Sequence, residues 1–411
     1  MTSVPSSRRA FSGALFALAI GSFGIGMTEF VVMGLLPEMA QELLPSVWAV
    51  SSEDAIAQAG WLITFYALGV VIGAPTIAGS VAKYPRHRVM IVLALALTLF
   101  NALTLVLPTF ELVAASRLLA GLPHGAYFGI GALVAADVMG PGNRAKGVAF
   151  VLTGLTVANV VGVPLGTFLG QNLGWRWAFL LVVVIFAAAT AAIAMTVPAH
   201  AGEPSRTLRA ELGVFRIGQV WFALGIGAIG FGGFFAVYSY VSPLVTEVAG
   251  SPAWTVPIVL VILGIGMTVG NLVGGHLADV NLIRALFGLL GLLVLSQLLL
   301  ALTAGWIVTL VVFVFLVAFA SSAVSPTIQT RLMDVAGDNQ SIAAALNHSA
   351  LNTGNALGAA LGGAVIAAGL GFVAPVWVGL VLAAGGVAIA VASIGIERKQ
   401  TAAAAREHAD A

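Results

Sequence analysis

A carboxylate stands in the middle of a long apolar stretch: Glu29, within FGIGMTEFVVMGLLP from Phe23 to Pro37. Arg117 and His124 interrupt a second such stretch. Ionisable side chains inside a membrane-length apolar run are costly, and they usually mark a path for ions or protons. A buried carboxylate near an arginine can exchange that partner for a proton, because burial disfavours the charged form while the arginine favours it. Arginine keeps its own proton, so these residues predict proton exchange at Glu29, with Arg117 and His124 beside it.

Two interpretations of this group remain open. Glu29 and Arg117 form either a structural ion pair that locks two helices together or a pair that takes part in transport chemistry. His348, near the start of another apolar run, is either a member of the polar group or a hydrated residue at a helix end. With Asn352 and Asn355 it follows i, i+4, i+7 spacing, which places all three on one helix face. A polar face would be costly against lipid, so it is expected to point into the bundle or a wet cavity.

The composition indicates which elements must position these residues. Of 411 residues, 60% are hydrophobic and 8% are charged, whereas soluble domains carry about 25% charged residues. Lipid must therefore be the solvent of most of the chain. The net charge of +1 gives no reason to expect a nucleic-acid partner, and the absence of cysteine excludes disulfides and thiolate metal sites. The first apolar run is longer than a signal peptide, so we expect it to be a retained span.

Twelve apolar stretches are long enough to cross a bilayer, which needs about 20 residues. They fall into two sets of six, separated by a polar connection at 198–217. The sequence therefore predicts an all-α integral membrane protein, with twelve transmembrane helices in two pseudo-symmetric six-helix bundles around a central cavity. The expected spans are 11–36, 58–80, 88–107, 110–137, 145–171, 176–197, 219–244, 254–277, 283–303, 305–327, 342–369 and 371–394.

Basic residues predict the orientation, because loops rich in Lys and Arg stay in the cytoplasm. All 17 basic residues except Arg117 and Arg176 fall on one side of the twelve-span arrangement. We therefore expect both termini and the central connection to be cytoplasmic. The loops of the opposite side carry acidic residues instead, namely Glu38, Glu42, Glu53, Asp54, Glu111 and Glu247.

The two sets of spans repeat each other. FALAIGSFGIG from Phe16 matches FALGIGAIGFG from Phe222, and NVVGVPLG from Asn159 matches NALGAALG from Asn355. Two similar halves in one orientation suit a transporter that rocks about a site between them; the alternative is chance likeness between Gly- and Ala-rich helices. We expect an N-terminal bundle at 1–197, a cytoplasmic linker at 198–217, a C-terminal bundle at 218–396 and a cytoplasmic tail at 397–411.

The repeat also serves as an internal control for the ionisable residues. Glu29 aligns with Phe235, while Arg117 falls near Val314. The architecture therefore does not require charges at these places, and their presence in one half only favours function over scaffolding. Both lie about seven residues from the outer ends of their helices, roughly 10 Å deep at 1.5 Å per residue, so we expect them at one level.

Small residues four apart allow helices to cross closely. In the fifth span Gly162 and Gly166 form such a pair, Gly154 lies two turns earlier, and Pro164 adds a kink. Tight packing is sufficient to explain this helix-packing motif. Other residues are expected to line a substrate cavity, although each type also occurs in packed cores: Phe30, Met33, Tyr66, Asn159, Tyr238, His348, Asn352 and Asn355.

Motifs of other machinery are missing from the sequence. It contains no GxxxxGK[ST] phosphate loop, no HExxH motif and no GxSxG motif. Direct drive by ATP is therefore unsupported, and we expect no nucleotide, no metal, no cofactor and no enzymatic activity.

Three segments resemble motifs of the major facilitator superfamily, a family of twelve-span transporters, and the likeness extends over essentially the whole chain. RLLAGLPHG from Arg117 resembles the family's fourth-helix motif, whose arginine is associated with proton coupling, and this implies that role for Arg117. GSVAKYPRHR from Gly79 stands where the signature loop between the second and third helices belongs, with Lys83 in place of the usual aspartate. The resemblance implies a gating loop made of Gly79, Lys83, Arg86 and Arg88, with Asp279 and Arg284 in the second-half copy.

GVPLGT from Gly162 resembles the fifth-helix antiporter motif, with the proline displaced by one position. Together with GMTEFVVMGLLP from Gly26, it resembles the drug:proton antiporter branch, in particular the chloramphenicol-resistance and arabinose-efflux-permease group. The resemblance implies proton-coupled efflux of small amphipathic compounds such as antibiotics, by alternating access across the inner membrane of a bacterium. Its expected partners are a small-molecule substrate, protons and the lipid bilayer, and we expect a monomer.

Other functions remain open. A proton-coupled sugar, nutrient or metabolite transporter needs many hydrogen-bond partners in its cavity, whereas an aromatic, Met-lined cavity suits drugs. The sequence offers both kinds of face. A non-transporting membrane receptor is a third interpretation, against which the lack of any soluble domain argues.

Overall fold

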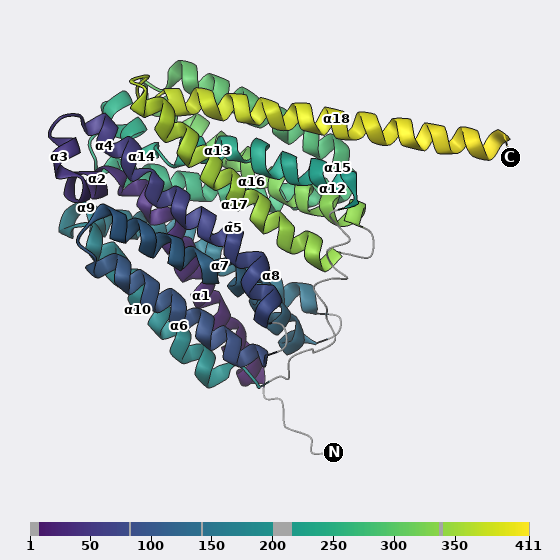
Figure 1. Cartoon of the computed structure of the whole chain (residues 1–411), viewed down its shortest axis with the longest axis horizontal. Coiled ribbons are helices and arrows are strands. Elements are labelled where there is room, and N and C mark those ends of the chain that lie inside the picture. The colour runs from purple at the N-terminus through teal and green to yellow at the C-terminus, as the bar shows by residue number, and fades with distance from the viewer. Residues whose placement is uncertain (1–7, 82–83, 141–142, 200–215, 337–339, 411) are drawn as a thin grey trace.

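The structure is a computed structural model that describes residues 8–81, 84–140, 143–199, 216–336 and 340–410. Lys83 and most of the expected linker lie outside the described residues. The first half consists of α1 (Arg8–Gly34), α2 (Leu36–Leu43), α3 (Pro45–Trp48), α4 (Ser52–Ala59), α5 (Trp61–Val81), α6 (Arg86–Val106), α7 (Phe110–Met139), α8 (Arg144–Val157), the π-helical turn η1 (Ala158–Gly162), α9 (Val163–Leu173) and α10 (Trp175–Thr196) (Figure 1). The second half consists of α12 (Gly218–Gly225), η3 (Ile226–Gly230), α13 (Gly232–Tyr238), α14 (Val241–Pro243), η4 (Leu244–Val248), α15 (Thr255–Thr303), α16 (Ile307–Ala336), α17 (Gln340–Ala367) and α18 (Ala374–Asp410).

The structure confirms the twelve-helix architecture. In the described part of the chain, 11 helices are long and apolar enough to cross a membrane, and one of them, α15, has 49 residues. At 1.5 Å per residue such a helix would be about 74 Å long, more than twice the roughly 30 Å of a bilayer core. Non-helical backbone angles at Asn281, φ −161° and ψ 98°, divide α15 into two helices. Each of these supplies one span, so the spans are twelve.

The repeat predicted from the sequence has a counterpart in helix packing. In the first half α8 lies against α1 so closely that a Cβ added at Gly154 would be 2.1 Å from the carbonyl oxygen of Ala19. In the second half α17 lies against α13, and a Cβ added at Gly358 would be 2.3 Å from the carbonyl oxygen of Gly232. Only glycine permits backbone approach of this kind. The glycine rows of the fifth and eleventh spans thus set the same helix contact twice.

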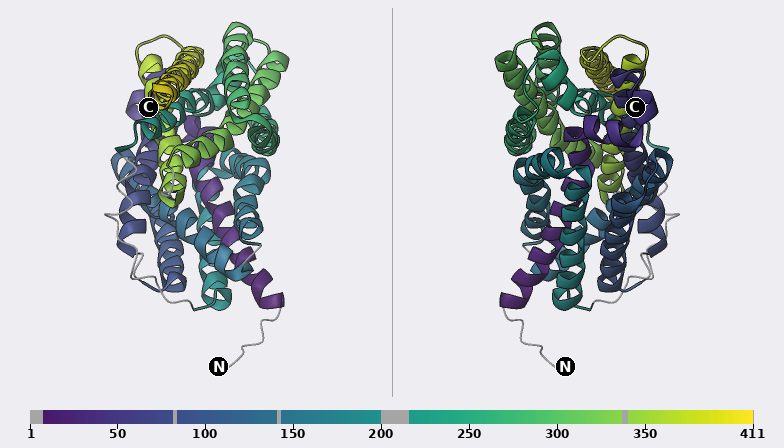
Figure 2. Two further views of the ribbon diagram at one scale, coloured as in Figure 1. Left: turned by 90° about the vertical axis from the view of Figure 1, so that its right-hand side faces the viewer. Right: turned by 90° about the vertical axis from the view of Figure 1, so that its left-hand side faces the viewer.

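Among the described residues, the two halves share one hydrophobic core at one end of the molecule only. At the end that carries α4, here named the α4 end, Leu36 and Ile56 of the first half belong to the same buried cluster as Val245 and Leu260 of the second. At the opposite end, where α1 begins and α18 finishes, the buried clusters belong to one half each. We name this the termini end, and Figures 1 and 2 show the helices of the two halves diverging toward it. The halves are therefore closed together at the α4 end.

Tyr240 marks this closure. Its hydroxyl donates to the carbonyl oxygen of Ala359 in the same half at 2.7 Å, and the side chain is 1% exposed. The same hydroxyl lies against Gly60 of the first half, where an added Cβ would be 2.2 Å from it. A glycine of one half thus forms part of the wall around a tyrosine of the other. This contact must separate if the α4 end opens.

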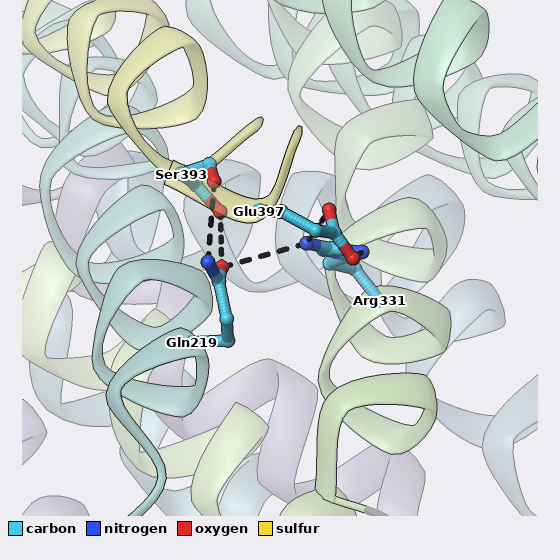
Figure 3. A network of polar contacts seen from close by, with 4 residues as sticks. All are labelled: Gln219, Arg331, Ser393 and Glu397. Atoms are coloured by element: carbon cyan, nitrogen blue, oxygen red, sulfur yellow. Dashed lines mark hydrogen bonds and ion pairs between the residues drawn. The ribbon is translucent and has the colours of Figure 1, made fainter. Parts of the chain in front are cut away.

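Polar side chains tie helices of the second half together at the termini end (Figure 3). Arg331 of α16 donates to both carboxylate oxygens of Glu397 in α18, at 3.2 and 2.7 Å. Gln219 of α12 accepts from the Ser393 hydroxyl at 2.6 Å and donates to the Ser393 carbonyl oxygen at 3.2 Å. Bidentate pairing gives such a contact a defined geometry. Beyond Glu397, α18 continues as a helix to Asp410, through most of the expected tail.

Arg176 is one of the two basic residues that do not fall on the expected cytoplasmic side. It lies at the α4 end, and its contacts there explain its position. Its side chain donates to the carbonyl oxygens of Leu105 and Leu107 at 3.1 and 3.2 Å and forms an ion pair with Glu42. The cation therefore holds the end of α6, the start of α10 and α2 together. Its role here is structural, since it joins three elements.

Candidate functional site

Arg117 of α7 is fully buried and is held by residues of three other helices of the first half. Its Nη1 donates to Thr28 Oγ1 and its Nη2 donates to the Thr28 carbonyl oxygen, each at 2.8 Å. The guanidinium lies 4.1 Å from the ring centroid of Tyr66 and 5.6 Å from that of Phe179. A buried cation needs hydrogen-bond partners and gains from aromatic faces. The site therefore holds Arg117 by α1, α5 and α10 together.

Glu29, the next residue of α1, is held by the opposite half. Its Oε1 accepts a hydrogen bond from Asn355 Nδ2 of α17 at 3.1 Å, and the residue is 7% exposed. Successive residues of a helix point about 100° apart. Thr28 can therefore face the arginine inside the first half while Glu29 faces the second half. The carboxylate sits at a junction between the two halves.

Phe30 extends this junction. Its ring stacks on Tyr238 with a centroid distance of 5.5 Å and on Phe235 with one of 6.4 Å, both from α13. Offset stacking of this kind adds to the energy of apolar burial. Phe235 is the repeat partner of Glu29, so the position that carries a carboxylate in one half carries an aromatic face in the other.

The interpretation of Glu29 and Arg117 as a locking ion pair does not match this geometry. Within the described part of the chain no ion pair joins the two side chains; Arg117 bonds Thr28 and Glu29 bonds Asn355. The two side chains lie close enough for the charge of Arg117 to act on Glu29. Glu29 and Arg117 interact through their charges without a direct hydrogen bond, because each side chain bonds a different partner.

His124 and His348 are connected to Arg117 through aromatic rings. His124 Nδ1 is 3.1 Å from the hydroxyl of Tyr66, whose ring supports the guanidinium. Phe128 meets the His124 ring edge-on at 5.3 Å and stacks in parallel on His348 of α17 at 5.6 Å. His124 is 3% exposed and His348 is partly exposed. The two histidines thus flank one phenylalanine, and this contact also crosses between the halves.

Buried amide oxygens without hydrogen-bond partners occur on three of the expected cavity residues. In the part of the chain that the structure describes, the Oδ1 atoms of Asn159, Asn352 and Asn355 are buried and have no hydrogen-bond partner. Such atoms are uncommon and call for a donor from water or ligand. Asn159 lies in η1, the π-helical turn before Pro164. Proline cannot donate to the carbonyl of the preceding turn, so a π-helical turn at this place is expected.

The remaining predicted residues lie away from this group. Met33 is fully buried in the core that both halves share. Gly162 and Gly166 face α1, where added Cβ atoms would be 2.8 Å from Met27 and Val31 respectively.

The expected gating residues lie at the termini end. Arg86 forms an ion pair with Asp137 of α7. Arg88, Asp279 and Arg284 are exposed, and the backbone N–H of Arg284 donates to Asn281 Oδ1 at 3.0 Å. Gly79 lies near the end of α5.

Two residues of the site were missed by sequence reasoning. Thr28 receives both Arg117 bonds, and its hydroxyl lies 2.5 Å from Asn101 Oδ1. The available signal was Asn101 itself, an amide in the middle of an apolar span. Thr28 carries no such signal, since threonine is ordinary in membrane helices and commonly bonds its own backbone.

Comparisons with known proteins agree with this architecture. Residues 18–306 match the family model described as Major Facilitator Superfamily. The chain is 38% identical to the Inner membrane transport protein YdhP of Escherichia coli (strain K12), over 87% of this chain and 90% of that protein. It is 29% identical to the Chloramphenicol resistance protein of Streptomyces lividans, over 92% and 94%. The crystal structure of D-xylose-proton symporter superposes with a TM-score of 0.73 at 15% identity, over 93% of this chain and 97% of that one, and this likeness shows the fold alone.

Proposed function

This chain belongs to the Major Facilitator Superfamily, and we propose that it exports small amphipathic compounds from the cell in exchange for protons. Membership makes it a multi-pass transporter of the bacterial inner membrane and gives no indication of a catalytic activity. Proton coupling, the direction of transport and the class of substrate are the proposal.

The observation that carries the proposal is the hydrogen bond between Glu29 and Asn355. It places an ionisable group of the first half in direct contact with the second half. A charge-assisted bond is stronger than one between neutral groups, so gain or loss of the proton changes the energy of a contact between the halves. That link between proton and conformation is what a coupled transporter requires.

The mechanism follows from the two ends of the molecule. The halves, taken as 1–197 and 218–396 and joined by the linker at 198–217, rock about the junction at Glu29. The structure described above is closed at the α4 end, with Tyr240 against Gly60. In the opposite state Glu29 takes a proton from the outside; in the present state it releases that proton and substrate enters from the cytoplasm. Both termini and the tail at 397–411 then lie in the cytoplasm.

Arg117 and His124 act on Glu29 in different ways. Arg117 supplies a fixed positive charge beside the carboxylate, which favours the ionised form and hence proton release. His124 anchors Tyr66 through the contact of 3.1 Å and thereby the ring below Arg117. The gating residues Gly79, Arg86, Arg88, Asp279 and Arg284 lie at the termini end, which opens and closes in this cycle, and we propose that Lys83 acts with them.

The substrate class is inferred from the surfaces at the junction. Phe30 and Tyr238 are buried aromatic rings stacked on each other, and the Oδ1 atoms of Asn159, Asn352 and Asn355 are buried acceptors without a partner among the described residues. An apolar body with one or a few hydrogen-bond donors fits this combination. The relative named for chloramphenicol resistance supports the same class. We further propose that the protein works as a monomer.

A second candidate is a proton-coupled sugar or nutrient transporter. It is favoured by the acceptors themselves, since Asn159, Asn352 and Asn355 together could receive several hydroxyl groups. A sugar transporter would require these amides and tolerate loss of the Phe30 ring, whereas an exporter of amphipathic compounds would require the ring.

The test is an efflux screen followed by a coupling assay on purified protein in liposomes. Expression in a host that lacks its own exporters should raise resistance to an amphipathic compound, and a protonophore should abolish the effect. Glu29→Gln keeps the shape of the side chain but cannot ionise. The variant should assemble and bind substrate yet move no protons against it.

The matched control is Phe235→Leu, the same position in the other half, which should leave proton movement intact. If Glu29→Gln still exchanges protons for substrate at the normal ratio, Glu29 is a packing or recognition residue. The carrier would then be His124 or His348, and the proposal in its present form would be wrong.

A further inference from the structure

Arg117 is the end of a chain of hydrogen bonds that starts on α6. Asn101 Nδ2 donates to the carbonyl oxygen of Leu97 in its own helix at 2.8 Å. Asn101 Oδ1 lies 2.5 Å from Thr28 Oγ1, and Thr28 Oγ1 in turn lies 2.8 Å from Arg117 Nη1. Thr28 and Asn101 are both 0% exposed. Thr28 therefore bonds Arg117 on one side and Asn101 on the other.

The direction of each bond in this chain is determined. The Asn101 amide nitrogen is used by a backbone carbonyl, so its oxygen must face Thr28. An amide oxygen only accepts, so the Thr28 hydroxyl must donate to it. Guanidinium only donates, and the lone pairs of Thr28 Oγ1 are therefore turned to Arg117. Asn101 in this way prepares Thr28 as an acceptor, with the Thr28 carbonyl oxygen as the second.

The repeat provides a comparison inside the same molecule. A shift of 196 positions relates Asn159 to Asn355, and the same shift relates Asn101 to Gln297. Gln297 is also 0% exposed, but in the described residues both its Oε1 and its Nε2 lack a partner. In the first span the repeat has a shift of 206 positions, as from Phe16 to Phe222, so the residue that matches Thr28 is Phe234. A buried amide occurs in both halves, and the chain of bonds exists only in the half that carries Glu29.

We propose that Thr28 and Asn101 form a seat that positions Arg117 beside Glu29 without letting it bond the carboxylate, so that Glu29 stays free to exchange its proton. They are positioning residues, since neither contacts the proton carrier through its side chain. This inference rests on the proposed function of Glu29. Arg117 Nε is already buried without a partner among the described residues, while the Thr28 carbonyl oxygen keeps Nη2 in place. Without the Thr28 hydroxyl, Nη1 would lose its partner as well, and the guanidinium would turn toward the carboxylate one residue along α1 and hold it ionised.

Other titratable groups border the same space. They come from four of the elements that pack around the junction: Tyr66 from α5, His124 from α7, Tyr238 from α13 and His348 from α17. None of them is altered by the substitutions used below, so a change in pH dependence reports on Arg117 and Glu29.

The experiment measures substrate-driven proton exchange in liposomes as a function of external pH. Thr28→Val keeps the shape and removes the hydroxyl, while Thr28→Ser keeps the acceptor. A positive charge in direct contact favours an ionised carboxylate more than a nearby one does, so proton loading needs more acid; for Thr28→Val we expect half-maximal exchange at a lower pH, by less than the roughly 1 to 3 units that an opposite charge nearby produces in full. Thr28→Ser should behave as wild type. Asn101→Ala, which releases the Thr28 hydroxyl from its fixed orientation, should shift the profile in the same direction by less.

Gln297→Ala is the matched control and should leave the profile unchanged. An unchanged profile for Thr28→Val, in protein whose Glu29→Gln variant is uncoupled, overturns the seat and leaves the proposed function standing. If Glu29→Gln still exchanges protons for substrate, the proposed function is wrong, whatever the result for the Thr28 variants. If Thr28→Val does not fold, the pH profile of Asn101→Ala tests the proposal in the same way. Loss of folding in both variants, while Gln297→Ala folds, would make the pair structural and overturn the proposal.

Discussion

At the scale of single residues, Asn355 is the side chain through which the second half contacts the carboxylate of the first. Its Nδ2 donates to Glu29, while its Oδ1 is buried without a partner. An ionised carboxylate accepts from the amide nitrogen, and a protonated one can donate to the amide oxygen. One asparagine therefore serves both charge states of Glu29, which an aliphatic or a charged residue could not do.

Asn355→Ala should therefore uncouple the protein while leaving downhill movement of substrate in place. A hydrogen bond to a charged group contributes about 1.5–3 kcal/mol, so coupled exchange should fall roughly 10- to 100-fold. Downhill substrate flux in the double variant with Glu29→Gln should be no lower than in Glu29→Gln alone, because residues that act through one contact are not additive. Proton and substrate fluxes in the same liposomes measure both effects.

Asn172→Ala provides the comparison for that measurement, since Asn172 is exposed and its amide donates to the carbonyl of its own helix. Its fluxes should equal those of wild type. A double variant whose downhill substrate flux falls below that of Glu29→Gln would show that Asn355 acts on transport by another route than Glu29.

At the scale of elements, the contact between α8 and α1 has room for no residue other than glycine at position 154. An added Cβ at Gly154 would lie 2.1 Å from the backbone oxygen of Ala19 and 2.9 Å from the nitrogen of Phe23. Backbone atoms cannot turn away as a side chain can, so the helices must separate. Overpacking of this kind costs about 1–3 kcal/mol.

Gly154→Ala should accordingly lower the midpoint of thermal unfolding in detergent and slow transport. Gly129→Ala is the matched control, because Gly129 lies inside α7 with nothing within 4 Å of an added Cβ. Alanine is the better helix former, so this control should unfold at the same temperature or slightly higher. Equal unfolding temperatures for the two variants would contradict the close approach of α8 to α1.

The elements were largely predictable from the sequence, because twelve apolar runs, their repeat and the glycine spacing all carry periodic signals. The site was predictable in part. Glu29, Arg117 and His124 stand out as costly residues in apolar spans, and all three lie in one region of the structure. The seat under Arg117 was not predictable, since it depends on which way α1, α6 and α7 are rotated about their axes. Hydropathy places a span along the chain but leaves its rotation open when lipid and protein faces are equally apolar.

At the scale of the whole molecule, the orientation in the membrane remains a prediction from the basic residues. A reporter fused after Ser205 or at the C-terminus should be cytoplasmic, while one inserted between Glu53 and Asp54 in α4 should be external. These follow because loops rich in Lys and Arg are retained inside. Accessibility of the reporters to a membrane-impermeant reagent in intact cells is the measurement. An external C-terminus would contradict the even number of spans together with a cytoplasmic N-terminus.

The asymmetry between the halves sets a limit on the work that one transport cycle can perform. In the described spans, Glu29 is the carboxylate that lies away from the helix ends, and its repeat partner is Phe235. A single carrier moves at most one proton per cycle. For an uncharged substrate, a potential of 100 mV and a gradient of one pH unit then supply about 3.7 kcal/mol together, enough for a roughly 500-fold concentration ratio. For a substrate with one positive charge the exchange is electrically silent, and the same pH gradient alone supports only about a tenfold ratio. The voltage dependence of efflux would thus report the charge of the exported compound.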